Sequence, residues 1–211
     1  MGIAERRERE KEQRKNDIID AAEKVFFTKG LDMATMDDVA AEAELSKGTL
    51  YLYFKSKDEL IWAMNARGLE LMLNGFVKAI EKPKTGIEKL RALGQSYHQF
   101  YLDYPNYFDV LIKYEIITIH EDIVDETVLQ CDRLGQKNIE IVIQVIMEGQ
   151  ADGTISKDLN PLHTAIILWG QITGVIQILS KKGEHFKEAH DFDLDNLLDS
   201  TFAFILRAVR P

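Results

Sequence analysis

The chain has 211 residues, 45% of them hydrophobic, and a formal net charge of −9, which suits an ordinary globular protein with room for a sizeable core. The acidic balance argues against a protein that coats nucleic acid without sequence preference, so any DNA contact must come from a local basic cluster. The single cysteine, Cys131, excludes an intramolecular disulfide and fits a reducing compartment.

Residues 3–16 alternate acidic and basic side chains from Glu5 on, and the start of the chain lacks the apolar stretch of a secretory signal. Two interpretations of this segment stay open: a solvated helical extension or frayed arm, or a basic arm that touches DNA beside a main motif. After Asp17 the apolar spacing predicts an amphipathic helix that ends at Gly30, with core positions at Ile18, Ala22, Val25 and Phe26.

Residues 35–60, TMDDVAAEAELSKGTLYLYFKSKDEL, contain three helix-start signals and two very short turns. Thr35 suits the N-cap of a first helix and Ser46 that of a second, while Ser56 with Glu59 forms a capping box for a third. Two amphipathic helices joined by so short a turn are typical of a helix-turn-helix.

The second helix of this motif is the predicted recognition helix. Phosphates would attract Lys47 and Lys57, and Thr49 and Tyr51 could reach base edges, with Leu52 against a thymine methyl. The alternative for Tyr51 and Tyr53 is packing against a neighbouring helix. Within residues 45–57 three lysines meet no acidic residue, which predicts a small positive surface formed by Lys47, Lys55 and Lys57.

Beyond the motif every segment is predicted to be helical, so the chain is expected to be all-α with about nine helices. The later helices are predicted at about residues 56–80, 87–104, 107–115, 121–151, 161–182 and 193–209. We place the domain boundary near residue 56, with a DNA-binding domain over residues 1–56 and an effector-binding and dimerisation domain over residues 57–211.

The predicted helix that starts at Pro161 carries apolar residues around most of its circumference, so it needs cover on several sides. A second copy of the chain would supply that cover, and the candidate dimer-interface residues are Ile166, Gly170, Gly174, Leu198 and Phe202. Its apolar run, residues 165–179, is judged too short to span a bilayer, so a soluble protein is expected.

Little in the sequence predicts an enzyme or a bound cofactor, because Gly-rich phosphate loops, nucleophile elbows and zinc-ligand pairs are missing. A metal site near His185 and His190, beside Asp191 and Asp193, is a weak alternative. We therefore expect no catalytic residues, no resident metal and no cofactor.

Two stretches, AAEKVFFTKG and ATMDDVAAEAELSKGTLYLYFKSKDEL, closely resemble the N-terminal DNA-binding domain of the TetR family of bacterial transcriptional regulators. The resemblance implies a cytoplasmic, all-helical homodimer that reads a palindromic operator in double-stranded DNA and is released by a small-molecule effector. Carried over position by position, the implied DNA contacts are Thr35, Ser46, Lys47, Gly48, Thr49, Tyr51, Tyr53 and Lys57.

One position departs from the family pattern. Where the family commonly has glycine in the turn of the motif, this chain has Glu44. A left-handed backbone at that residue would cost about 1 kcal/mol, and the carboxylate would lie near DNA phosphate.

Residues 63–211 match the family only in their helical layout. Candidate effector-binding residues combine apolar walls with hydrogen-bonding groups: Tyr97, His98, Tyr101, Phe108, Ile112, Cys131, Trp169 and Gln171. Core packing is the alternative for each. The expected function is a ligand-released repressor; the alternatives are an activator without an effector, and a ligand-binding or interaction protein whose DNA binding is weakened or lost.

Overall fold

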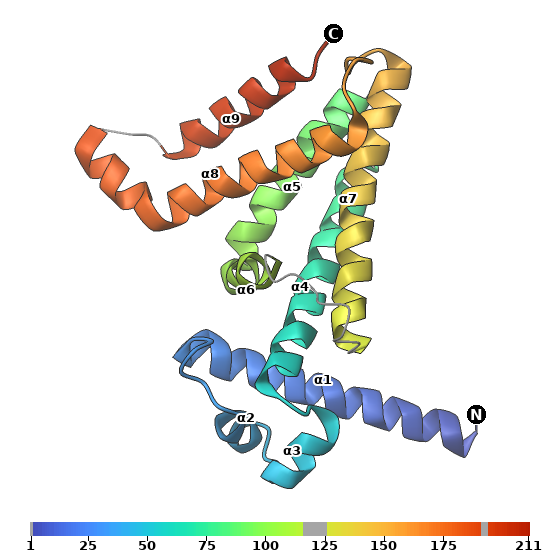
Figure 1. Ribbon diagram of the computed structural model, residues 1–211, viewed down its shortest axis with the longest axis vertical. Coiled ribbons are helices and arrows are strands. Elements are labelled where there is room, and N and C mark those ends of the chain that lie inside the picture. The colour runs from blue at the N-terminus through green and yellow to red at the C-terminus, as the bar shows by residue number, and fades with distance from the viewer. Residues whose placement is uncertain (1, 116–125, 191–193) are drawn as a thin grey trace. The chain divides into compact units, whose positions relative to one another are not determined.

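The computed structural model describes residues 2–115, 126–190 and 194–211, and over these ranges every regular element is an α-helix (Figure 1). The all-α prediction is therefore confirmed. The described helices are α1 (Ile3–Lys29), α2 (Met36–Glu42), α3 (Lys47–Tyr53), α4 (Lys57–Ala79), α5 (Gly86–Asp103), α6 (Pro105–Glu115), α7 (Glu126–Asp152), α8 (Pro161–His190) and α9 (Leu194–Ala208).

The predicted helix starts are confirmed by hydrogen bonds from side chains to the free backbone amides of the first turn. Thr35 accepts from the amide of Asp38, and Ser46 accepts from the amide of Thr49. At α4, Ser56 Oγ accepts from the Glu59 amide, whereas the Glu59 carboxylate accepts from the Lys55 amide. These caps fix where each short helix begins, and so they fix the motif.

The charged N-terminal segment is the helical extension that was one of its two interpretations: it is continuous with the following helix, so α1 is a single helix of 27 residues. One helix bound differs from prediction, because α8 does not end at Lys182 but continues through Gly183 to His190. The left-handed conformation that makes glycine a helix stop occurs at Gly30 and Gly153, and Gly183 does not adopt it.

The chain divides into two compact units. Unit 1 contains residues 1–68 and 106–132, and unit 2 contains residues 69–105 and 133–211. The core of unit 1 joins α1, α2, α3, the first part of α4 and Val110 of α6 around fully buried residues such as Phe26, Leu50 and Met64. Whether the functional boundary lies near residue 56 stays a prediction.

Unit 2 packs α5, α8 and α9 against one another. Along α8, Ala165, Leu168, Ile172 and Ile176 are buried, whereas Ile166 and Ile167 on the other side are 48% and 58% exposed. By length and composition alone, Pro161–Gly183 would be long and apolar enough to cross a membrane. The sequence-based length argument was therefore wrong, although core and interface helices of soluble proteins pass the same test.

Candidate nucleic-acid interface

The turn between α2 and α3 is built from a left-handed residue and two capping hydrogen bonds. Glu44 has φ +54°, and its amide donates to Ala41 O while the Leu45 amide donates to Ala40 O. This pair of bonds is the Schellman pattern that ends a helix, with Leu45 packed against the core. The turn thus has the left-handed backbone conformation that glycine adopts most easily. Glu44 adopts it as well, with the backbone strain expected for a residue that has a side chain.

The core holds α3 in one orientation. Leu50 is fully buried and Phe54 is buried where α3 ends, so the opposite side of the helix must face outward. There Leu52 is 83% exposed and Tyr51 is 40% exposed. In unit 1, α2 and α3 lie together on one side of α1 (Figure 1). A short helix that presents large side chains to solvent from a fixed turn has the geometry of a DNA-reading element.

The remaining predicted contacts at the starts of α2 and α3 differ in exposure: Thr35, Ser46 and Gly48 are exposed, and Thr49 is half-buried. Thr35 and Ser46 are exposed at the starts of α2 and α3, where their hydroxyls are engaged in capping. Gly48 is exposed, and a β-carbon there would meet only Ser46 Oγ at 3.9 Å, so the fold itself does not require glycine. Thr49 is half-buried, with its hydroxyl 2.8 Å from that of Ser46.

Tyr53 is a predicted contact whose side chain the structure packs against the core. Its side chain is half-buried and packs against the core of unit 1, in agreement with the alternative of packing on a neighbouring helix. The side chain of Tyr51, two residues nearer the start of α3, remains partly exposed. The predicted DNA contact of each tyrosine stays a prediction.

Two of the three lysines in the expected cluster are already engaged with other groups. Lys47 Nζ lies 2.7 Å from Oδ1 of Asp37 on α2, and this bond raises the pKa of the lysine. Lys57 Nζ donates to Asp32 O at 3.2 Å and lies 5.9 Å from the centre of the Phe26 ring. The expectation that these lysines meet no acid was therefore wrong for Lys47, because Asp37 comes from outside the segment whose charges were counted.

A partly buried ion-pair cluster ties α4 and α6 to α1, and it was not predicted from the sequence. Arg67 on α4 donates to Asp20 at 2.6 Å and to Glu23 at 2.7 Å, both on α1. Tyr107 on α6 donates to the same Glu23 carboxylate, and burial first and this bond second raise the pKa of Tyr107. Since a half-buried carboxylate such as Glu23 needs partners, these bonds help to fix the register of the three helices.

The start of α2 carries a second, exposed group of charges. The Asp38 carboxylate accepts from Lys29 Nζ at 2.6 Å and from the hydroxyl and amide of Thr35. These bonds, that from Lys29 above all, lower the pKa of Asp38 to about 2. An ionised carboxylate here suits the positive end of α2.

The candidate effector residues are distributed between the two units. Phe108, Ile112 and Cys131 belong to unit 1, and burial raises the pKa of the Cys131 thiol to about 12. The others belong to unit 2, where Tyr97 is buried with its hydroxyl 2.8 Å from that of Thr173, and the rings of His98 and Tyr101 stack. Trp169 and Gln171 are exposed on α8. The effector-binding role of each of these residues stays a prediction.

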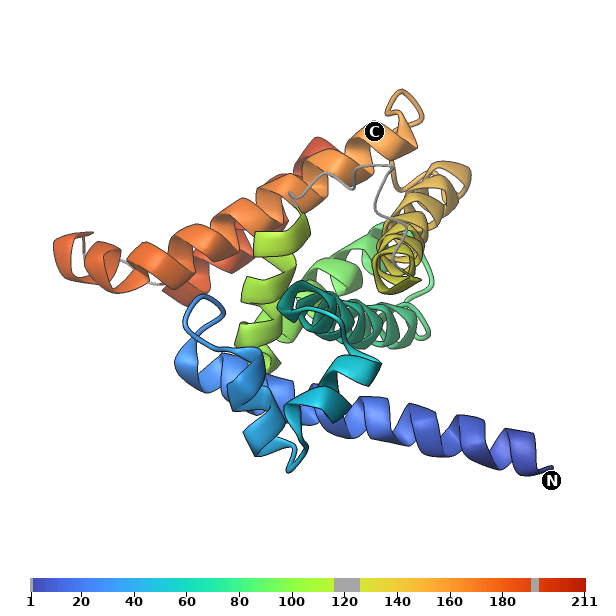
Figure 2. The same cartoon turned by 60° about the horizontal axis from the view of Figure 1, so that its bottom comes forward.

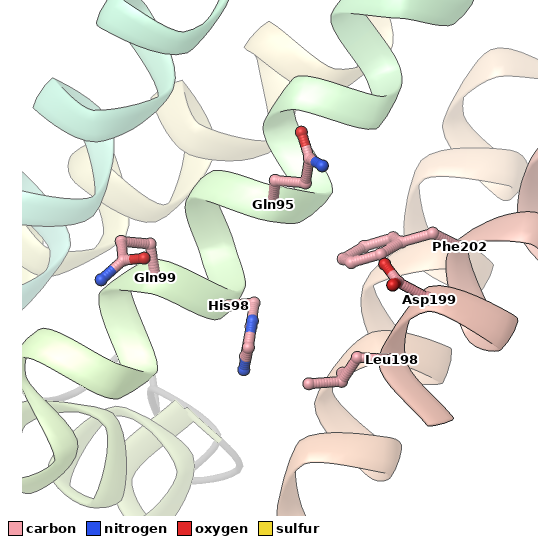
Figure 3. Close-up of a pocket in the computed structure, with 6 residues that line it drawn as sticks. All are labelled: Gln95, His98, Gln99, Leu198, Asp199 and Phe202. Atoms are coloured by element: carbon pink, nitrogen blue, oxygen red, sulfur yellow. The ribbon is translucent and has the colours of Figure 1, made fainter. Parts of the chain in front are cut away.

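Unit 2 also has a surface cleft of about 340 Å³ between α5 and α9. Figure 3 shows the α5 residues along one side and the α9 residues along the other. Only His98 belongs to the predicted effector set; the remaining lining residues are Gln95, Gln99, Leu198, Asp199 and Phe202. Asp199 and the glutamines have no distinctive spacing, so no sequence signal pointed to them.

The candidate dimer residues divide in the same way. Ile166, Gly170 and Gly174 lie on the open side of α8, and a β-carbon on either glycine would meet nothing within 4 Å. Leu198 and Phe202 of α9 are instead buried within the chain, where Phe202 packs on Gly94, while Phe204 is 67% exposed. If α9 takes part in an interface, the exposed Phe204, and not the buried Leu198 or Phe202, is the side chain that a partner would contact.

Among the described side chains, no group of three or more His, Cys, Asp or Glu residues is placed to hold a metal ion. Most of the weak candidate site near His185 lies outside the described side chains, namely His190, Asp191 and Asp193.

Comparison with known proteins matches residues 18–64 to the family described as bacterial regulatory proteins, tetR family. The HTH-type transcriptional activator FasR of Mycolicibacterium smegmatis is 31% identical over 90 residues, which is 43% of this chain and 41% of FasR. The HTH-type transcriptional repressor KstR2 of the same organism is 22% identical over 152 residues, 70% of each chain.

The extent of these matches differs between sequence and structure. An uncharacterized HTH-type transcriptional regulator of Haemophilus influenzae is 29% identical over 50% of this chain, and the chain spans only 57% of that relative's length. The transcriptional regulator FadR of Bacillus subtilis, solved with stearoyl-CoA, is 19% identical with a TM-score of 0.71, covering 92% of this chain and 98% of FadR. At 19% identity, this likeness shows that the two proteins share a fold.

Proposed function

Because the chain belongs to the TetR family of bacterial regulators, we propose that it is a DNA-binding transcriptional regulator, most simply a cytoplasmic repressor. The observation that carries the proposal is the outward face of α3, where Lys47, Tyr51 and Leu52 stand exposed beyond a fixed turn. Bases would be read from this face, while the start of α2 and the lysines would bind phosphate. No reaction is assigned to the protein.

The operator is proposed to be palindromic and to be bound by a homodimer. A two-fold symmetric pair of α3 helices would reach successive major grooves about 34 Å apart. Support for a second copy comes from the open side of α8, where Ile166, Ile167 and Trp169 are exposed large apolar residues.

The effector is proposed to be a small molecule bound by the C-terminal helices. It would change the separation of the two α3 helices, and a shift of a few ångströms from the ~34 Å spacing would prevent simultaneous docking. Since FadR was solved with stearoyl-CoA, long-chain acyl-CoA is the first class of effector to test.

Two alternatives have support. FasR is named an activator, so the protein could activate rather than repress. The carboxylates of Glu44 and Asp37 beside the reading face favour a protein with weakened DNA binding.

The test is a mobility-shift titration of the purified chain against the DNA upstream of its own coding sequence, at several salt concentrations. A sequence-specific shift that weakens with salt is expected. Lys47→Ala should weaken binding to all sequences alike, whereas Thr49→Ala should change the preference at one base position. Absence of a specific shift with every genomic fragment would refute the proposed function.

A further inference from the structure

The N-terminal half of α1 carries a one-sided basic surface. An α-helix turns about 100° per residue, so residues four, seven and eleven positions apart share a face. Arg14, Lys11 and Arg7 precede the buried Ile18 by those intervals, and Lys15 precedes the buried Ala22 by seven. We call these four residues the α1 basic stripe. The stripe lies on the same face of α1 as the residues that pack on the core of unit 1. It extends this face toward the N-terminus with charged side chains.

The direction of the stripe follows from the contacts farther along α1. Its core face packs into the cluster that includes Val39 of α2, Leu50 of α3 and Leu60 at the start of α4. The polar ties to Arg67 and Tyr107 come instead from the other side of the helix, through Asp20 and Glu23. Figures 1 and 2 show the first turns of α1 reaching out past α2 and α3. The stripe therefore faces the side of unit 1 that bears the reading helix.

The distribution of charge on this extension is not the one that best stabilises a solvated helix. Arg7, Lys11 and Lys15 are spaced four apart, an arrangement in which like charges repel and destabilise a helix. Arg6, on the far side, instead makes a favourable pair with Glu10 at 2.7 Å. Among the described residues, no carboxylate lies within 4.0 Å of Arg7 or Lys11.

From these observations we propose that the α1 basic stripe is a second DNA-binding site, which holds the phosphate backbone that flanks the half-site read by α3. The extension rises about 1.5 Å per residue and spans roughly 20 Å from residue 3 to residue 16, enough to reach phosphates beyond the groove that α3 enters. Arginine and lysine bind such phosphates without reading sequence. The inference rests on the proposed function, because DNA docked on α3 brings the flank to the stripe.

The experiment compares two charge-matched double variants by mobility shift. Arg7→Ala with Lys11→Ala removes two charges from the stripe, and Arg6→Ala with Arg9→Ala removes two from the other side of the same helix. Alanine favours helix, so both variants keep the extension helical, which circular dichroism verifies. The stripe variant should bind more weakly and lower the slope of log affinity against log salt by about 2 per protomer, at about 0.9 per phosphate contact. The control should retain most of the wild-type slope.

Duplex length supplies the second readout. Trimming the base pairs outside the half-sites should weaken the wild-type protein and the control, but not the stripe variant, which has already lost the flanking contact. Equal slopes for the two variants, or equal sensitivity to trimming, would overturn the inference. Lys47→Ala, measured on the full-length duplex, separates this failure from that of the proposed function: if the wild type binds specifically and Lys47→Ala weakens it, the function stands and only the stripe is wrong.

Discussion

Lys47 and Asp37 form an ion pair between the first turns of α3 and α2, with Lys47 Nζ 2.7 Å from Asp37 Oδ1. The lysine predicted to bind phosphate therefore has an internal partner that competes with DNA. Both side chains are exposed, so the pair is weak in water and a phosphate can replace the carboxylate. Asp37 would then remain close to the phosphate as an uncompensated negative charge.

Asp37→Asn should accordingly tighten DNA binding, roughly two- to fivefold, as expected for one exposed and screened charge. The gain should be the same for specific and nonspecific duplexes and should shrink as salt is raised. Fluorescence anisotropy at two salt concentrations measures both effects. In a Lys47→Ala background the gain isolates the direct repulsion by Asp37; weaker binding of the single variant would show that Asp37 helps to hold DNA.

Glu44 offers a separate test of strain and charge at the turn. Its φ of +54° costs about 1 kcal/mol for a residue with a side chain, a cost that glycine avoids. Glu44→Gly should therefore raise the free energy of unfolding by about 1 kcal/mol, or the melting temperature by about 2–4 °C. Glu44→Gln keeps the strain and removes only the charge.

The two Glu44 variants together separate the effects. Tighter DNA binding by both would assign the effect to the charge, and tighter binding by Glu44→Gly alone would assign it to the backbone. A Glu44→Gly protein that melts no higher than the wild type would mean that the left-handed turn carries no strain.

The sequence predicts well those features that depend on neighbouring residues. Helix starts follow from Thr35 and Ser46, because a cap bonds to amides only two or three residues away. The turn at Glu44 also follows, once the motif is identified. Gly183 shows the limit of such local signals: glycine permits a helix to stop, but packing decides, and α8 continues.

Features that depend on contacts between helices were missed for a physical reason. Counting charges within residues 45–57 leaves out Asp37, which reaches Lys47 only when α2 and α3 fold together. Periodicity likewise shows that a face of α9 is apolar without showing what covers it. Leu198 and Phe202 proved to be covered by the chain itself, and Phe204 stays exposed.

The link between α6 and α1 provides a stability test with a built-in control. Tyr107 is buried and donates to the Glu23 carboxylate, which Arg67 also binds. Tyr107→Phe removes one bond to a partly buried charge, and we expect a loss of about 1–2 kcal/mol in the free energy of unfolding by urea. Lys113→Met cuts another link of α6, the exposed pair with Asp32 in the turn that follows α1. It should change stability little, so similar losses from both variants would contradict the weight given to burial.

The dimer prediction can be tested at Gly174, which lies on the open side of α8 with nothing within 4 Å of a β-carbon. Gly174→Trp should leave the folded chain intact, because the new side chain starts from a β-carbon that meets no atom of its own protomer, but it should push a partner helix away. Light scattering should then report a monomer where the wild type is a dimer. Gly135→Trp on α7 is the matched control, since that glycine is equally open and lies outside the predicted interface. A well-folded Gly174→Trp dimer as tight as the control would place the interface on another surface, whereas a shift to monomer in the Gly174 variant alone would place the partner against α8.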